Sequence, residues 1–128
     1  MVTGGCGTVI YGGEMGGLGA ARRFALALPG VTEEPHFGMP SFRVRGKIFV
    51  TVPDCARLHV FVDPLAVAGY VAEDPAAFEP LRWGEKTRGL RVYLAAASAA
   101  RVREVIEESW RRKAPKAVVA AFDQGRPD

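Results

Sequence analysis

Apolar residues recur at helical spacing in three parts of the chain, and helix start and stop signals flank these parts. The pattern predicts a first helix over 18–28 and a second over 64–72, for which Asp63 supplies an N-cap. A third helix begins at Ser98 and ends before Pro115, and one short turn of helix is predicted over 116–122. The positions predicted to face the core are Leu18, Ala21, Phe24, Ala25 and Leu28 in the first helix, Leu65, Ala68 and Val71 in the second, and Val102, Val105, Ile106, Ser109 and Trp110 in the third.

Short runs of residues with high β propensity lie between these helices. They cover 41–44, 47–52, 58–62, 81–84 and 90–94. A three-residue loop over 45–47 would place Val44 opposite Ile48 and Phe42 opposite Val50, which gathers apolar side chains on one face. The other face of this predicted hairpin would then carry Arg43, Phe49 and Thr51.

The order of the elements predicts an α+β domain with two layers. Because the order α-β-β-β-α-β-β-α has no parallel crossover among its first strands, we expect a five-stranded antiparallel sheet with helices packed on one face. We expect a single domain over 18–124. Residues 1–17 form a glycine-rich leader, either flexible or foreign to the native protein, and the sequence leaves both readings open.

The composition is that of a soluble globular domain. Of the 128 residues, 48% are hydrophobic and 24% are charged, which excludes disordered, collagen-like and coiled-coil proteins. The chain lacks both a signal peptide and the roughly 18 to 20 apolar residues that cross a bilayer, so we expect a cytoplasmic protein with no membrane partner. Cys6 and Cys55 are too few for a disulfide scaffold or a zinc site, and we expect free thiols.

Three patterns suggest site chemistry, and the geometry that each chemistry needs argues against all three. The glycine-rich segment 12–19 carries Glu14 where a pyrophosphate site needs glycine. Cys55 and His59 would lie about 13 Å apart on an extended segment, too far for an activated thiol. His36 and its neighbouring carboxylates occupy one irregular segment, which rarely makes a closed metal site. We therefore expect no catalytic residue, no metal and no cofactor.

The two tryptophans are predicted to be core residues and not stacking platforms. Trp110 lies on the apolar stripe of the last long helix, and Trp83 lies in a strand rich in residue types that are usually buried. The same reasoning applies to Tyr70 and Tyr93.

Several motifs together resemble the MmcQ/YjbR family. The specific part is the block G-x-P-x-F-x-V-x-G-K-x-F, which runs over residues 38–49. Supporting segments are Leu28-Pro29-Gly30-Val31, His36-Phe37, Trp83-Gly84, Ser109-Trp110 and Ala114-Pro115-Lys116. The resemblance covers residues 20–122 and implies a small antiparallel sheet covered by helices, similar to CyaY-like (frataxin-like) and secretion-chaperone-like domains. It also implies DNA binding through a winged arrangement, without a catalytic residue.

Basic residues gather at the two predicted hairpins, where acidic residues are few. Between residues 35 and 61 the sole acid is Asp54, and between 82 and 91 it is Glu85. Protruding turns with this charge can straddle a duplex and neutralise its phosphates, provided that both turns point to the same side. We therefore predict a DNA-binding protein that contacts the phosphate backbone through Arg43, Arg45, Lys47, Arg57, Lys86 and Arg88.

The alternative is a protein-interaction or chaperone-like module that acts as a homodimer without nucleic acid. Such a module would use an exposed sheet face or the C-terminal helix, and its mark is an apolar patch larger than the few hundred Å² that monomers expose. An enzyme has the least support, because no nucleophile, base and orienting group can be assembled from the sequence.

Overall fold

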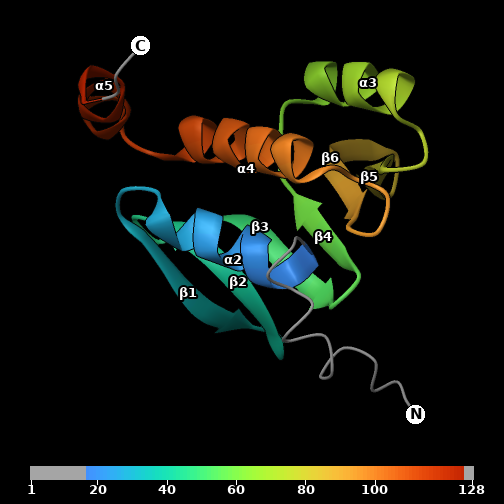
Figure 1. The fold of residues 1–128 in the computed structure, drawn as a ribbon, viewed down its shortest axis with the longest axis horizontal. Coiled ribbons are helices and arrows are strands. Elements are labelled where there is room, and N and C mark those ends of the chain that lie inside the picture. Colours follow the sequence, from blue (N-terminus) through green and yellow to red (C-terminus); the bar gives the residue numbers. More distant parts are fainter. Residues whose placement is uncertain (1–16, 126–128) are drawn as a thin grey trace.

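The computed structural model describes residues 17–125, which form helices and one six-stranded sheet (Figure 1). The helices are α2 (Gly17–Ala27), α3 (Pro64–Glu73), α4 (Ala99–Lys113) and α5 (Lys116–Gln124). The strands are β1 (Val31–His36), β2 (Met39–Val44), β3 (Lys47–Asp54), β4 (Arg57–Val60), β5 (Phe78–Trp83) and β6 (Lys86–Tyr93). All neighbours pair antiparallel in the order β1-β2-β3-β4-β6-β5. The α+β class and the antiparallel sheet are confirmed, whereas the predicted number of five strands is wrong.

The strand missing from the prediction is β1, an edge strand with a polar sequence. It pairs with β2 along its whole length, from Val31 opposite Val44 to His36 opposite Met39. Its burial pattern shows no buried position, so the hydrophobic alternation that identifies a strand is absent. Pro35 is tolerated because an edge strand does not need every N–H for pairing.

The helices at the two ends of the described chain also differ from expectation. Helix α2 starts at Gly17, and the rest of the leader predicted over 1–17 lies outside the described residues. Helix α5 is nine residues long, where a single turn was expected. Within residues 17–125, no helix has the length and apolar character needed to span a bilayer.

The turn between β2 and β3 contains two residues, not the predicted three. Arg45 and Gly46 have φ values of 52° and 80°, the positive pair that a type I′ turn requires. Lys47 therefore pairs with Val44. The pairing of Val44 with Ile48 that the longer loop predicted is wrong.

A β-bulge restores the predicted register further along this hairpin. The pairing shifts between Phe42 and Arg43, so Phe42 still lies opposite Val50 as predicted. Phe49 is the extra residue and is fully buried. The expectation that Phe49 shares the other face with Arg43 and Thr51 is therefore wrong, because strict alternation does not hold through a bulge.

A hydrophobic core fills the space between the sheet and the helices α2 and α4, which lie against each other (Figure 1). The predicted stripe of α4 is confirmed, since each of its five positions is buried. The sheet contributes the fully buried side chains Phe42, Val44, Val50, Leu58, Val60, Leu90 and Val92. Helix α2 contributes Ala21 and Ala25, as its spacing predicted.

Helix α3 presents a different face to the core from the one predicted. Its buried residues are Val67 and Tyr70, whereas Leu65 is 88% exposed. The Tyr70 hydroxyl donates to the Glu108 carboxylate of α4 at 2.8 Å, and its ring centre lies 5.2 Å from that of Phe78. Because α3 is apolar almost all round, its sequence does not single out one face. Of the predicted stripe, Leu65 and Ala68 are exposed, whereas Val71 is half-buried and packs against the core as predicted.

Ser109 ties α4 to the sheet beside the end of β4. Its buried hydroxyl lies 2.8 Å from the carbonyl oxygen of Phe49 and 2.7 Å from that of Phe61. The Trp110 indole Nε1 donates to the Pro29 carbonyl oxygen at 3.1 Å, which ties the chain after α2 to the same helix. The last turn of α4 is thereby held beside the end of β4.

Gly89 allows β6 to approach β4 closely. A Cβ at this position would lie 2.2 Å from the Val60 carbonyl oxygen and 2.8 Å from the Phe61 Cα. Both of these atoms belong to the backbone, so neither can rotate away. No side chain larger than hydrogen fits at position 89 without movement of a strand.

We predict that Gly89→Ala lowers the free energy of unfolding by about 3 kcal/mol, the upper part of the range for overpacking. The matched control is Gly69→Ala in α3, where an added Cβ meets nothing within 4 Å. Alanine is the better helix former, so the control should gain about 0.5 to 1 kcal/mol. Urea denaturation measures both variants. Equal unfolding midpoints for Gly89→Ala and the wild type would contradict the close approach.

Candidate functional site

A cavity of about 740 Å³ lies on the face of the sheet opposite α2 and α4. Side chains alternate along a strand, and Val50 and Val60 point into the core, so Thr51 and His59 point to the other face. Both line the cavity, whose volume is within the range of about 300 to 1,000 Å³ typical of ligand sites. Two hairpins and the last turn of α4 complete the walls with His36, Phe37, Trp83, Arg88, Arg112 and Lys113.

Trp83 lies on the rim of this cavity and is 55% exposed, so the prediction of a core tryptophan is wrong. It is the last residue of the edge strand β5, immediately before the turn at Gly84. The Arg88 guanidinium carbon lies 4.8 Å from the indole centre, and the Phe61 ring contacts it edge-on at 5.9 Å. Trp83 is therefore a surface aromatic residue that is held in place by a cation and a second ring.

Phe37 stands at the tip of the β1–β2 hairpin and is 91% exposed. Its φ of 51° lies in the left-handed region, which a bulky aromatic residue rarely adopts. The two-residue turn that it forms with Gly38 imposes this conformation, and the His36 ring contacts it at 4.5 Å. The chain thus holds a large apolar ring in water at the edge of the cavity, an arrangement that does not serve the core.

Three cations line one side of the cavity, Arg88 from the β5–β6 hairpin and Arg112 and Lys113 from α4. The charge of Lys47, the first residue of β3, also acts on Lys113. We call these four residues the cationic cluster. Burial lowers the pKa of Lys113, and the charges of Arg112, Lys47 and Arg88 lower it further. None of the ion pairs found within residues 17–125 involves a member of the cluster. Its positive charge is therefore available to a ligand.

The residues predicted for the first hairpin lie in two places. Lys47 belongs to the cationic cluster, and Arg45 is exposed in the adjoining turn. Arg43 lies on the open face, where its guanidinium donates to the Ser41 hydroxyl and to the Pro35 carbonyl oxygen, both at 3.2 Å. The side chain of Arg43 thus ties β2 to β1.

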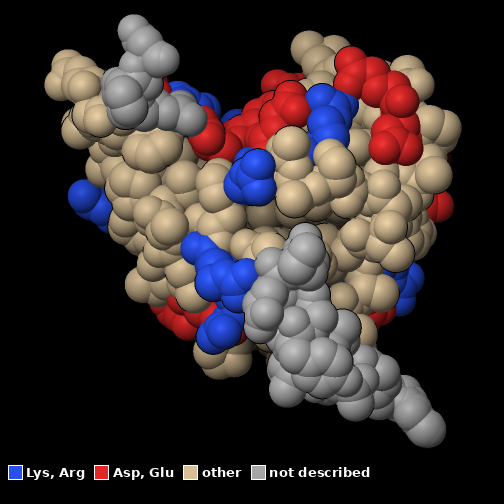
Figure 2. Space-filling view, in the orientation of Figure 1, with Lys and Arg blue, Asp and Glu red and all other residues tan. Residues whose placement is uncertain are grey.

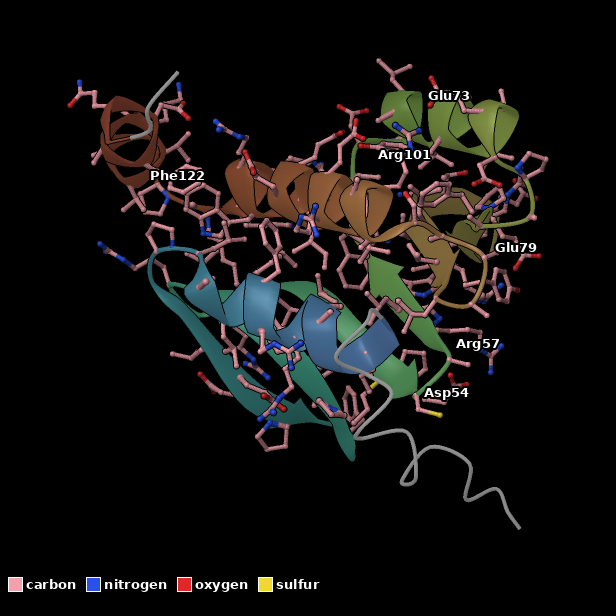
Figure 3. All side chains as sticks on the ribbon, in the orientation of Figure 1. Asp54, Arg57, Glu73, Glu79, Arg101 and Phe122 are labelled. Atoms are coloured by element: carbon pink, nitrogen blue, oxygen red, sulfur yellow. The ribbon has the colours of Figure 1, made fainter. Side chains whose placement is uncertain are left out.

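Arg57 lies apart from the cationic cluster. It is the first residue of β4, and its guanidinium pairs with the Asp54 carboxylate at 2.5 Å. This hydrogen bond lowers the pKa of Asp54. Figure 3 shows Asp54 and Arg57 on the side of the molecule away from Phe122, whose ring packs on Trp110 near the end of α4.

In the second hairpin, Lys86 and Arg88 are strand residues of β6 and not part of a long turn, because β5 and β6 are joined by Gly84 and Glu85 alone. Both side chains are exposed, and Arg88 belongs to the cationic cluster. The polar loop predicted over 85–89 is therefore shorter than expected, and the strands on both sides of it are longer.

Arg112 and Lys113 line the cavity but were not among the predicted DNA-binding residues. Glu108 and Arg112 lie four residues apart, a spacing at which an ion pair can form along a helix. In the structure Glu108 accepts a hydrogen bond from Tyr70, and Arg112 donates to the Phe61 carbonyl oxygen at 3.3 Å. The three basic residues that end α4 were the available signal.

The thiol–imidazole pair considered above does not form. Cys55 is disulfide-bonded, so the expectation of a free thiol at this position is wrong. His59 lies in β4 opposite Thr51, where burial lowers the pKa of its imidazole, as do the charges of Arg91 and Arg57. His59 is therefore neutral at pH 7.

Among residues 17–125, no three His, Cys, Asp or Glu side chains are grouped in a way that could hold a metal ion.

The helix-covered face carries both acidic and basic side chains (Figure 2). Figure 2 shows acidic side chains gathered over α3 and α4. Arg101 pairs there with Glu73 and with Glu104, and Arg111 pairs with Asp123 at 2.6 Å. Arg111 also pairs with Glu107, one helical turn before it, at 3.0 Å. These ion pairs neutralise Arg101 and Arg111, although Arg103 of the same helix forms none of the ion pairs found within residues 17–125. The open face, where Arg88, Arg112 and Lys113 line one cavity, is the better candidate for a polyanion.

We predict that Lys113→Met raises thermal stability at pH 7 and low salt. Because the folded-state pKa of Lys113 is lowered, its charge disfavours the folded chain, and this penalty disappears only as the pH rises through that pKa toward the ordinary value of 10.5. We expect a gain below about 1 kcal/mol. Thermal unfolding at two salt concentrations measures it, since salt screens the like charges but leaves the burial penalty.

The control for this experiment is Lys116→Met, which removes an exposed lysine of α5 outside the cluster. Its stability should change by no more than about 0.5 kcal/mol. A Lys113→Met variant that is less stable than the wild type at low salt would show that Lys113 is not held against like charges.

Comparison with known proteins agrees with this architecture. The YjbR family model matches residues 26–112, more than half of the chain. The crystal structure of Deinococcus radiodurans protein DR2400, whose domain is named DUF419, is similar with a TM-score of 0.66 and 22% identity over 89% of this chain and 91% of that chain. This likeness concerns the fold alone. No curated protein matches the sequence. Because the family match runs from the end of α2 through all six strands into the last turn of α4, the chain belongs to the YjbR family, as its motifs predicted.

Proposed function

We propose that this protein binds DNA without catalysing a reaction, and that it holds the phosphate backbone at the cationic cluster. The observation that supports the proposal is that the β5–β6 hairpin and the end of α4 bring Arg88, Arg112 and Lys113 to one cavity. Burial lowers the pKa of Lys113, and the charges of Arg112, Lys47 and Arg88 lower it further. Like charges that lie this close together without carboxylate partners favour an anionic ligand, because a phosphate offsets their repulsion. Membership of the YjbR family, for which the sequence resemblance implied DNA binding, agrees with this proposal.

The same arrangement sets how many phosphates are contacted and how salt affects binding. If each of the four cations neutralises one phosphate of a duplex, the slope of log affinity against log salt is about −3.6. Arg45 and Lys86 are exposed on the same two hairpins and would extend the contact along the backbone. Arg57 is not part of this surface, because its guanidinium is paired with Asp54.

The test is to replace the whole cluster in one variant, Lys47→Gln, Arg88→Gln, Arg112→Gln and Lys113→Gln, and to measure duplex binding by fluorescence anisotropy. We expect affinity to fall roughly tenfold or more at low salt, and the salt slope to approach zero as the counterion-releasing contacts are lost. Circular dichroism confirms that the variant remains folded.

A second variant with the same change in net charge is the control. It replaces four cations of the helices with glutamine: Arg22, Arg23, Arg103 and Lys116. Its affinity for the duplex should stay close to that of the wild type. Equal losses in the two variants would mean that only net charge matters, and an absence of duplex binding by the wild type at low salt would end the proposal.

A second candidate function is protein interaction through a homodimer, which the exposed apolar residues favour. Phe37, Trp83 and Leu65 are 91%, 55% and 88% exposed, respectively. Phe37 and Trp83 both line the cavity, and Leu65 follows the cavity residue Pro64. A second copy that covers these side chains would remove them from water.

For this second function we predict a mass in sedimentation experiments that rises with protein concentration toward that of a dimer. Phe37→Asn should return the protein to the monomer, because asparagine suits the left-handed turn position and removes the apolar ring. A wild-type protein that is monomeric at every concentration would exclude the homodimer and leave DNA binding as the function to test.

A further inference from the structure

We infer that the cavity on the open face binds an unpaired base of a single-stranded nucleic acid, stacked on Trp83, while the cationic cluster holds the adjoining phosphates. This inference rests on the proposed function and specifies the form of its ligand. A nucleotide has an aromatic base and a phosphate, and the rim of the cavity presents an aromatic ring and cations side by side.

Trp83 and Phe37 offer exposed aromatic rings at the cavity. With Arg88 and Phe61 already in contact, more than half of the Trp83 surface is still exposed. Phe37 is almost fully exposed at another point of the same cavity, in a backbone conformation that bulky residues rarely adopt. Exposed aromatic rings beside a basic groove are the usual platforms for unpaired bases, because every base has a face that can stack.

Arg88 contacts the Trp83 ring and is also a member of the cationic cluster. Its guanidinium lies over the Trp83 ring at 4.8 Å and also acts on the charge of Lys113. A nucleotide whose base reaches Trp83 thus has a cation for its phosphate at the same place. The floor of the cavity adds His59, a neutral imidazole that can donate one hydrogen bond and accept another at a base edge.

The shape of the site favours a single strand over a duplex. In a duplex both faces of every base are covered by neighbouring bases, so aromatic side chains do not reach them. A base can enter a concave cavity only after it leaves the stack, which a single strand allows at little cost in free energy. A duplex would contact the cationic cluster through its backbone and leave Trp83 unused.

The experiment compares four ligands of wild-type protein: a thymidine 12-mer, an abasic 12-mer with the same phosphates, a 12-base-pair duplex and thymidine monophosphate. We expect the thymidine 12-mer to bind tightest, with a salt slope of about −2.8 if four phosphates are contacted. It should quench the fluorescence of Trp83, whereas Trp110 is fully buried and should not respond. The abasic strand and the mononucleotide should bind more weakly, since each lacks one half of the interaction.

The diagnostic variant is Trp83→Leu, for which we expect roughly 5- to 150-fold weaker binding of the thymidine 12-mer and unchanged binding of the duplex. Trp83→Phe keeps an aromatic ring and should restore much of the affinity. Leu26→Ala, which shortens an exposed apolar side chain of α2 outside the cavity, is the control and should have no effect.

The outcomes separate this inference from the proposed function. Equal affinities for the thymidine strand, the abasic strand and the duplex, with no effect of Trp83→Leu, would overturn base stacking and leave phosphate binding intact. Mononucleotide binding as tight as that of the strand would overturn the single-strand assignment. If none of the four ligands binds at low salt, both proposals fail.

Discussion

The position of α4 on the sheet depends on one buried hydroxyl. The Ser109 hydroxyl lies within hydrogen-bond distance of two carbonyl oxygens, that of Phe49 in β3 and that of Phe61 just after β4. The Phe49 carbonyl also accepts from the Phe61 N–H and the Phe61 carbonyl from Arg112, so this hydroxyl adds the roughly 0.5 to 1.5 kcal/mol of a typical hydrogen bond. Because Arg112 and Lys113 follow within one helical turn, the contact that completes the core also sets where these cations meet the sheet.

This placement has an electrostatic consequence that packing does not explain. Two arginines of α4 have carboxylate partners, Glu73 for Arg101 and Asp123 for Arg111. The last turn of α4 instead brings Lys113 toward the like charges of Lys47 and Arg88. Cations that line one cavity and form none of the ion pairs found within residues 17–125 make a surface suited to an anion.

The sequence predicted well those elements whose pattern is local. The stripe of α4 and the Asp63 cap follow from spacing alone and are confirmed. The pairing of Phe42 with Val50 is also confirmed, but only because a bulge offsets the shorter turn. The exposure of Trp83 did not follow, because it depends on which strand lies at the edge of the sheet. The role of Arg112 was also hidden, since its partner is a carbonyl 51 residues away. Long-range pairing, and not residue type, determines both.

The candidate site exists because the sheet is twisted. Phe37 and Trp83 stand at hairpin tips on opposite ends of the strands, and four strands in the order β2-β3-β4-β6 connect their hairpins. In a flat sheet they would occupy distant corners, yet both line one cavity. Each pair of strands rotates by roughly 20 to 25° in the same sense, which raises diagonal corners toward the same face. The bulges in β2–β3, β3–β4 and β5–β6 increase this rotation. The cavity is therefore formed by the whole sheet, and no local sequence motif could predict it.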